Sequence, residues 1–127
     1  MIIDRLISAI TEHEGWHPVG SEQSPSGSRS YRHHNPGNLR TSPFAYKIED
    51  GYAVFKNDEI GRLALHFDIL KKAAGQTSTT LGPESTLREL IFTYAPPQDN
   101  NNSEAYLADV VAKTGVPETL TLKELFA

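Results

Sequence analysis

The chain has 127 residues, the usual size of one compact domain. Its 12 basic and 16 acidic residues give a net charge of −4, and the basic residues do not form a run, which argues against nucleic acid as a partner. The absence of cysteine excludes disulfides, thiolate metal sites and a cysteine nucleophile. No apolar run approaches the about 18 residues that span a bilayer, and the first residues lack the pattern of a signal peptide, so we expect neither a membrane anchor nor an export signal.

The first element is an amphipathic helix over residues 2–14. Its apolar residues recur at the helical spacing i, i+3, i+4, i+7: Ile3, Leu6, Ile7 and Ile10. Gly15 and Pro18 are stop signals. The Gly-, Ser- and Pro-rich stretch from Val19 to Ser30 is typical of a loop.

A β-hairpin follows. The strand-like runs Phe44–Ile48 and Tyr52–Phe55 flank Asp50-Gly51, a strong turn dipeptide. Next, a helix begins near Asn57 or Asp58 and ends before Gly75. We expect one side of this helix to be apolar, with the residues Ile60, Leu63, Ala64, Phe67 and Leu70.

The last third predicts more helices. Thr86 and Glu89 form a capping box for a helix that Pro96-Pro97 closes after Tyr94. Ser103 is expected to cap a further helix that ends at Gly115, and Thr121-Leu122-Lys123-Glu124 is a second possible capping box. The sequence therefore predicts an α+β, predominantly helical single domain over residues 1–127.

The string His13-Glu14-Gly15-Trp16-His17 matches the zinc-hydrolase motif H-E-x-x-H. That motif needs one helix running through both histidines. Gly15 lies inside the motif and Pro18 follows it, so we expect His17 to lie outside the helix and no metal to bind. A zinc metallohydrolase remains an alternative reading.

Glu14 is the main catalytic candidate. At about 100° per residue, it lies about 30° from the centre of the apolar stripe, whereas Glu12 lies about 170° away. Partial burial and the helix dipole raise the pKa of a carboxyl group at such a position, which suits a glycosidase acid. A structural glutamate bonded to a neighbouring loop fits the spacing equally well.

Two amide-rich segments are candidate sugar contacts. Asn35-Pro36-Gly37-Asn38 has strong turn chemistry, and its amides offer the donors and acceptors that sugar hydroxyl and acetamido groups require. Tyr94-Ala95-Pro96-Pro97, followed by Asn100, Asn101, Asn102 and Tyr106, has the same character. Each segment alone is also compatible with an ordinary connection between elements.

Taken in order, three blocks resemble the lysozyme-like superfamily, in particular small phage and bacterial muramidases and lytic transglycosylases. The blocks are Ile10–Gly15, Arg32–Arg40 with Gly51–Phe55, and Tyr94–Pro97 with Asn101, Asn102 and Tyr106. The resemblance implies a lysozyme-like fold, with Glu14 as catalytic acid. It also implies that Asn35, Asn38 and Tyr94 lie beside the scissile bond and that Asn102 and Tyr106 contact sugar.

The resemblance implies cleavage of the β-1,4 bond between N-acetylmuramic acid and N-acetylglucosamine in peptidoglycan, without a metal or organic cofactor. We expect the protein to act in the periplasm or cell wall, delivered by phage lysis, a virion or a secretion system, or made in the cytoplasm before release. A monomer is the default expectation. The aspartate and threonine that follow the glutamate in phage lysozymes are missing here. Glu22, Glu49, Asp50 and Asp99 are conceivable second carboxylates, but none matches by motif. Hydrolysis and transglycosylation both stay open, as does a catalytically silent structural or glycan-binding domain.

Overall fold

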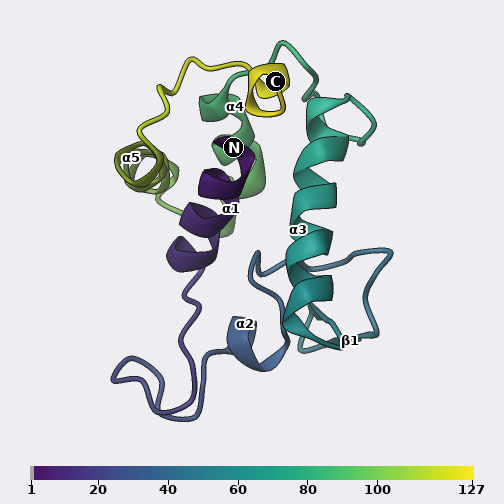
Figure 1. Ribbon diagram of the computed structural model, residues 1–127, viewed down its shortest axis with the longest axis vertical. Coiled ribbons are helices and arrows are strands. Elements are labelled where there is room, and N and C mark those ends of the chain that lie inside the picture. Colours follow the sequence, from purple (N-terminus) through teal and green to yellow (C-terminus); the bar gives the residue numbers. More distant parts are fainter. Residues whose placement is uncertain (1) are drawn as a thin grey trace. The chain divides into compact units, whose positions relative to one another are not determined.

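The computed structural model describes residues 2–127 (Figure 1). In chain order the elements are α1 (Ile2–His13), α2 (Arg29–Arg32), β1 (Lys47–Glu49), β2 (Tyr52–Val54), α3 (Asp58–Ala73), α4 (Leu87–Tyr94), the 3₁₀ turn η1 (Pro97–Asp99), α5 (Ser103–Thr114) and α6 (Leu122–Leu125). The predicted α+β class is confirmed: helices predominate over strands, and the two strands form one small antiparallel hairpin. Within residues 2–127 every helix is too short or too polar to cross a membrane.

The chain divides into two compact units. Ile10–Asp68 forms the first, here called the hairpin unit, and residues 2–9 with 69–127 form the second, here called the helical unit. The hairpin unit contains α2 and both strands, whereas the helical unit contains α4, α5 and α6. The boundaries fall inside α1 and α3, so each of these two helices contributes residues to both units.

The hairpin is built around its predicted turn. Asp50 and Gly51 have φ values of 53° and 79°, and Glu49 pairs with Tyr52 across the two strands. Two successive positive φ values produce a turn whose twist matches that of antiparallel strands. Of the two, β2 carries the buried side chains, Ala53 and Val54, while β1 is exposed along its length.

The loop predicted at residues 19–30 ends in a short helix that the sequence pattern did not indicate. Ser28 caps α2, because its Oγ accepts hydrogen bonds from the N–H groups of Tyr31 (3.3 Å) and His17 (2.9 Å). Only four residues are helical, too few for a periodic pattern. The Ser28 cap fixes the loop that leads into the candidate site.

The helical unit confirms two predicted caps, the capping boxes at Thr86–Glu89 and at Thr121–Glu124, and corrects a third. Thr86 and Glu89 form the expected capping box at the start of α4. At α5, however, Asn102 is the cap, with Oδ1 accepting from the Ala105 N–H at 3.1 Å. Ser103 is buried inside the first turn, where its hydroxyl donates to the Ala95 carbonyl at 2.6 Å. The prediction of a Ser103 cap was therefore wrong by one residue.

The C-terminal segment joins the start of α4. The Leu87 N–H donates to the Leu120 carbonyl (2.9 Å), and the Leu122 N–H donates to the Ser85 carbonyl (2.8 Å). In Figure 1, α6 accordingly lies beside the first turn of α4. Leu87 and Leu122 are both fully buried there, so these bonds are protected from water.

The predicted apolar face of α3 is confirmed at Ala64, which is 1% exposed, but is wrong at Leu63 and Leu70. Leu63 and Leu70 are 55% and 43% exposed, whereas Leu65 and Ile69 are fully buried. Apolar residues occur on both sides of this helix, so periodicity alone could not select the buried side. Gly61 lies on the same face as Leu65 and packs against the His34 carbonyl and the Pro36 ring, all within the hairpin unit. That close approach determines which side of α3 is covered.

Candidate functional site

Glu14 directly follows His13, the last residue of α1, and lies in the turn that ends this helix. Its N–H donates to the Ile10 carbonyl (2.8 Å), while the N–H groups of Gly15 and Trp16 donate to Glu12 (3.1 Å) and Thr11 (3.3 Å). With Gly15 at φ 80°, this is the Schellman arrangement that ends many helices. Glu14 is half-buried and Glu12 is exposed, which confirms the assignment of the two carboxylates to different sides.

The same terminus removes the geometry of a zinc hydrolase. α1 ends at His13, and Gly15 turns the chain into the left-handed region, so His17 is not on the helix one turn later. Among the described residues, no group of three or more His, Asp or Glu side chains is arranged to hold a metal ion. We therefore discard the reading of His13-Glu14-x-x-His17 as a zinc motif.

Two contacts connect the Glu14 turn to the segment that contains α2 and the Asn-Pro-Gly-Asn loop. The Nδ2 of Asn38 donates to Oε1 of Glu14 at 3.4 Å, and the Ser30 hydroxyl donates to the Gly15 carbonyl at 3.2 Å. Asn38 adopts φ 51°, a left-handed conformation that asparagine tolerates, and its Oδ1 is buried without a hydrogen-bond partner. The structure thus brings the predicted acid and one predicted sugar-contacting amide together.

Asn35 has a different role from the one predicted. Its side chain is completely buried, and Nδ2 donates to the carbonyls of Leu39 (2.8 Å) and Ala53 (3.0 Å). Its Oδ1 accepts from the Leu39 N–H at 2.9 Å. Because both donors and the acceptor are used inside the loop, a direct sugar contact by Asn35 is incompatible with this arrangement. Asn35 instead fastens the Asn38 loop to β2.

Asn35→Ala should therefore destabilise the protein. The substitution leaves the Ala53 carbonyl and the Leu39 N–H without the partner that Asn35 provides, while the Leu39 carbonyl keeps its bond from the Ala53 N–H (3.0 Å). We expect a loss of about 3 kcal/mol in the free energy of unfolding. Urea denaturation monitored by circular dichroism measures this loss. Asn38→Gly is the matched control, since it removes an amide with a single 3.4 Å bond, glycine accepts the φ of 51°, and stability should change by less than about 1 kcal/mol. Equal effects for both variants would contradict the assignment.

Glu49, one of the conceivable second carboxylates, lies on β1 beside a buried histidine. Its carboxylate is 3.8 Å from Nε2 of His33 and 3.8 Å from the Lys47 ammonium group. His33 is 3% exposed, and its Nδ1 has no hydrogen-bond partner. Glu49 thus contacts basic groups of the hairpin unit.

Tyr94 and Tyr106 meet inside the helical unit. Their ring centroids are 6.5 Å apart in an edge-to-face arrangement, and the Lys72 ammonium lies 4.9 Å from the Tyr94 ring centroid. Tyr94 is half-buried, whereas Tyr106 is 2% exposed. Tyr106 is therefore a core residue that supports Tyr94, and the predicted sugar contact by Tyr106 does not agree with its burial.

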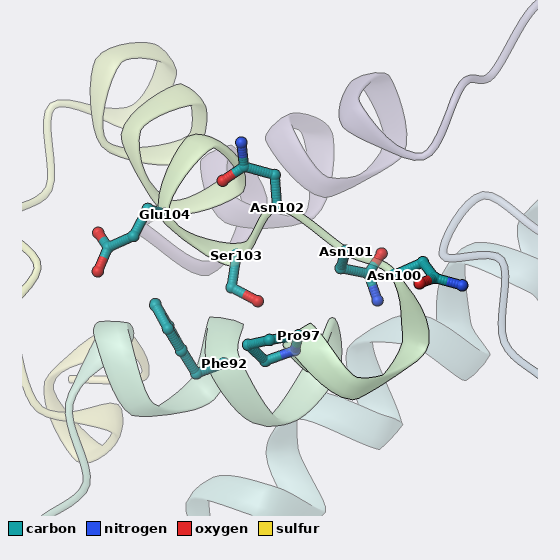
Figure 2. Close-up of a pocket in the computed structure, with 7 residues that line it drawn as sticks. All are labelled: Phe92, Pro97, Asn100, Asn101, Asn102, Ser103 and Glu104. Atoms are coloured by element: carbon teal, nitrogen blue, oxygen red, sulfur yellow. The ribbon is translucent and has the colours of Figure 1, made fainter.

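Asn102 lies in a pocket of ≈ 490 Å³ in the helical unit (Figure 2). The pocket is lined by Phe92, Pro97, Asn100, Asn101, Asn102, Ser103 and Glu104. In Figure 2, Phe92 and Pro97 lie on one side and the segment from Asn102 to Glu104 lies across from them. Asn102 thus lines a pocket, as a sugar contact must, although its Oδ1 is already used in capping α5.

Phe92 was not singled out from the sequence. It precedes Tyr94 by two positions and points to another side of α4, and the Arg88 guanidinium lies 4.7 Å from its ring centroid. Arg88 forms ion pairs with Glu104 and, at 3.5 Å, with Glu118. Hydrogen bonding to Glu104 raises the pKa of Arg88, so this cation stays charged beside the pocket. The i, i+4 spacing of Arg88 and Phe92 was the available signal.

The candidate residues thus form two separate groups. Glu14, Asn35 and Asn38 belong to the hairpin unit, whereas Tyr94, Asn102 and Tyr106 belong to the helical unit. Comparisons of the chain with protein-family models, with curated proteins and with solved structures find no match. The function therefore has to be inferred from the side chains of these two groups and their contacts.

Proposed function

We propose that the protein is a peptidoglycan-cleaving enzyme of lysozyme-like fold, with Glu14 as its acid. The observation that carries this proposal is the half-buried Glu14 carboxylate at the end of α1, in contact with the Asn38 amide. The negative end of a helix and partial shielding from water oppose ionisation of a carboxyl group, whereas a hydrogen bond donated by Asn38 favours it, and a glycosidase acid has to exchange between these two forms. The bond that the enzyme would cleave is the β-1,4 bond between N-acetylmuramic acid and N-acetylglucosamine.

In the proposed reaction Glu14 donates its proton to the glycosidic oxygen as the bond from that oxygen to C1 of the muramoyl residue breaks. In a hydrolase, water then attacks C1 and its proton passes to Glu14. In a transglycosylase, the muramoyl 6-hydroxyl oxygen attacks C1, its proton passes to Glu14, and a 1,6-anhydro ring forms. Both routes regenerate the protonated acid without a metal or organic cofactor.

The Asn38 amide can hydrogen-bond to Glu14 in both of its protonation states. Its Nδ2 donates to Glu14, as an ionised carboxylate requires, while its unpartnered Oδ1 could accept the proton of a neutral carboxyl after rotation of the amide. Asn38 would then accompany Glu14 through both protonation states. If Glu14 had only a structural role, the hydrogen bond from Asn38 Nδ2 to the ionised carboxylate would be sufficient.

A glycan-binding domain without catalysis is the second candidate function. The observation that favours it is the pocket of the helical unit, where an aromatic ring and a proline lie close to three consecutive asparagines. Apolar rings and amides are the groups that sugar faces and hydroxyls engage. In this case the protein would hold peptidoglycan and release nothing from it.

Mass spectrometry of the released products separates these functions. Purified peptidoglycan is incubated with the protein, and the soluble fragments are examined before and after borohydride reduction. Anhydro-muramoyl ends, which resist reduction, support a transglycosylase, and reducible muramic acid ends support a muramidase. Absence of fragments while the protein co-sediments with the wall contradicts the enzyme and supports the binding domain.

A further inference from the structure

The hairpin unit contains two arginines that lie against one tyrosine ring. The Arg29 guanidinium carbon is 3.6 Å from the centroid of the Tyr52 ring, and that of Arg40 is 4.8 Å from the same centroid. The two arginines are eleven positions apart in the sequence, and the fold brings both guanidinium groups to the same Tyr52 ring. Two positive charges held this close repel each other unless an anion accompanies them.

No acidic group of the described residues pairs with either arginine. Glu49 lies opposite Tyr52 across the two strands, but its carboxylate contacts His33 and Lys47 instead. Within residues 2–127, neither guanidinium forms a hydrogen bond or an ion pair, and Nε of Arg29 is buried without a partner. This is unusual for a chain with more acidic than basic residues, in which Arg88 pairs with two glutamates. Residues 24–57 carry five Lys or Arg residues against two Asp or Glu residues, so their own segment is basic.

Stacking on Tyr52 leaves the binding groups of the arginines available. A guanidinium that lies over a ring uses its flat face, while its N–H donors project from its edge. These donors form a fork that matches the two oxygens of a carboxylate or phosphate. The ring restrains the side chains, so less conformational entropy is lost when an anion binds.

Both arginines adjoin the residues that contact the Glu14 turn. Arg29 directly precedes Ser30, whose hydroxyl donates to Gly15, and Arg40 follows Asn38, whose amide donates to Glu14, by two positions. All of these residues belong to the hairpin unit. An anion bound by the arginines would therefore lie on the same part of the molecule as the proposed acid.

We infer that Arg29 and Arg40, supported by Tyr52, form a binding site for a carboxylate. This inference rests on the proposed function in one respect, the source of the carboxylate. Of the two alternating sugars in peptidoglycan, only muramic acid carries an acidic branch, a lactyl group extended by a peptide. The site would recognise this branch and so distinguish peptidoglycan from a neutral N-acetylglucosamine polymer.

The test measures binding in the Glu14→Gln background, so that no ligand is consumed. Calorimetry compares a soluble peptidoglycan fragment with its peptides, the same fragment after amidase treatment, which retains only lactyl carboxylates, and neutral chitotetraose. We expect Arg29→Gln and Arg40→Gln each to weaken binding of at least one acidic fragment about tenfold. Binding of chitotetraose should stay within twofold. Loss with the first fragment alone identifies a peptide carboxylate, and loss with the second identifies the lactyl carboxylate.

Arg62→Gln is the matched control, because Arg62 is exposed on α3 in the same unit and its loss changes the net charge equally. A similar effect from Arg62→Gln, or equal weakening for chitotetraose, overturns the inference. Arg40 is exposed, so Arg40→Gln keeps the test valid even if Arg29→Gln fails to fold. The release of products is measured separately, with Glu14 intact. Arginine-dependent binding together with no released products contradicts cleavage and supports the carboxylate site, whereas released products together with binding that does not depend on the arginines contradict the carboxylate site and support cleavage.

Discussion

Glu14→Gln is expected to lower the rate of cell-wall clearing by at least about a hundredfold, because general acid catalysis typically contributes a factor of about 10²–10⁴. Glutamine has the same shape as glutamate but cannot donate a proton to the glycosidic oxygen. Its amide can still hydrogen-bond to Asn38, so stability should change by less than about 1 kcal/mol. The measurement is the turbidity of purified peptidoglycan, together with the thermal unfolding midpoint of the variant.

Glu12→Gln is the control for Glu14→Gln. Glu12 lies two residues earlier on the same helix, has the same charge, and is exposed where Glu14 is half-buried. Its substitution should leave clearing unchanged. Wild-type clearing by Glu14→Gln would reject Glu14 as the acid and leave it as a structural glutamate, whereas equal losses in both variants would indicate a general charge effect.

Gly61→Ala should cause a large loss of stability, although it adds only one methyl group. A Cβ at Gly61 would lie 1.8 Å from the His34 carbonyl oxygen and 2.9 Å from the Pro36 side chain. A separation of 1.8 Å is far below van der Waals contact, and the nearest atom belongs to the backbone, so α3 or the His34 segment has to shift. We expect a net destabilisation of at least about 2 kcal/mol, even though alanine favours a helix over glycine by about 1 kcal/mol.

Thermal unfolding checks this expectation, with a shift of about 8 °C for a chain of this size. Gly82→Ala is the control, since a Cβ at Gly82 would meet no atom within 4 Å. Because the 34–36 segment leads directly to Asn38, Gly61→Ala should also reduce clearing activity at temperatures where the protein remains folded. A variant as stable as the wild type would show that α3 does not approach this loop so closely.

Local signals in the sequence were sufficient for several elements. Asp50-Gly51 indicated the hairpin because few other dipeptides accept two positive φ values. The Thr86–Glu89 capping box marked the start of α4, and Gly15 marked the end of α1. The helical angle between Glu12 and Glu14 also predicted which carboxylate would be shielded. In each case the interaction lies within a few residues of the chain, so the sequence pattern contains it.

Other features of the site depend on contacts between distant segments. Asn35 and Asn38 occupy the same short turn motif and have the same side chain, yet Asn35 bonds inward to Ala53 while Asn38 reaches Glu14. Because apolar residues occur on both sides of α3, the sequence did not indicate which side is buried. The close approach of Gly61 to the His34 carbonyl shows which side it is. Arg29 and Arg40 are too far apart in the sequence to form a run of basic residues, but in the structure both guanidinium groups lie against the Tyr52 ring.

The α+β class, most element boundaries and Glu14 as the shielded carboxylate were thus readable from the amino-acid sequence, because they follow from spacing and local backbone preference. The three-dimensional arrangement was needed to separate Asn38 from Asn35, to exclude Tyr106 and the zinc motif, and to assemble the arginine pair. The hydrogen bonds, burial and ion pairs of a side chain depend on which distant segments of the chain are in contact. A local sequence pattern does not contain this information.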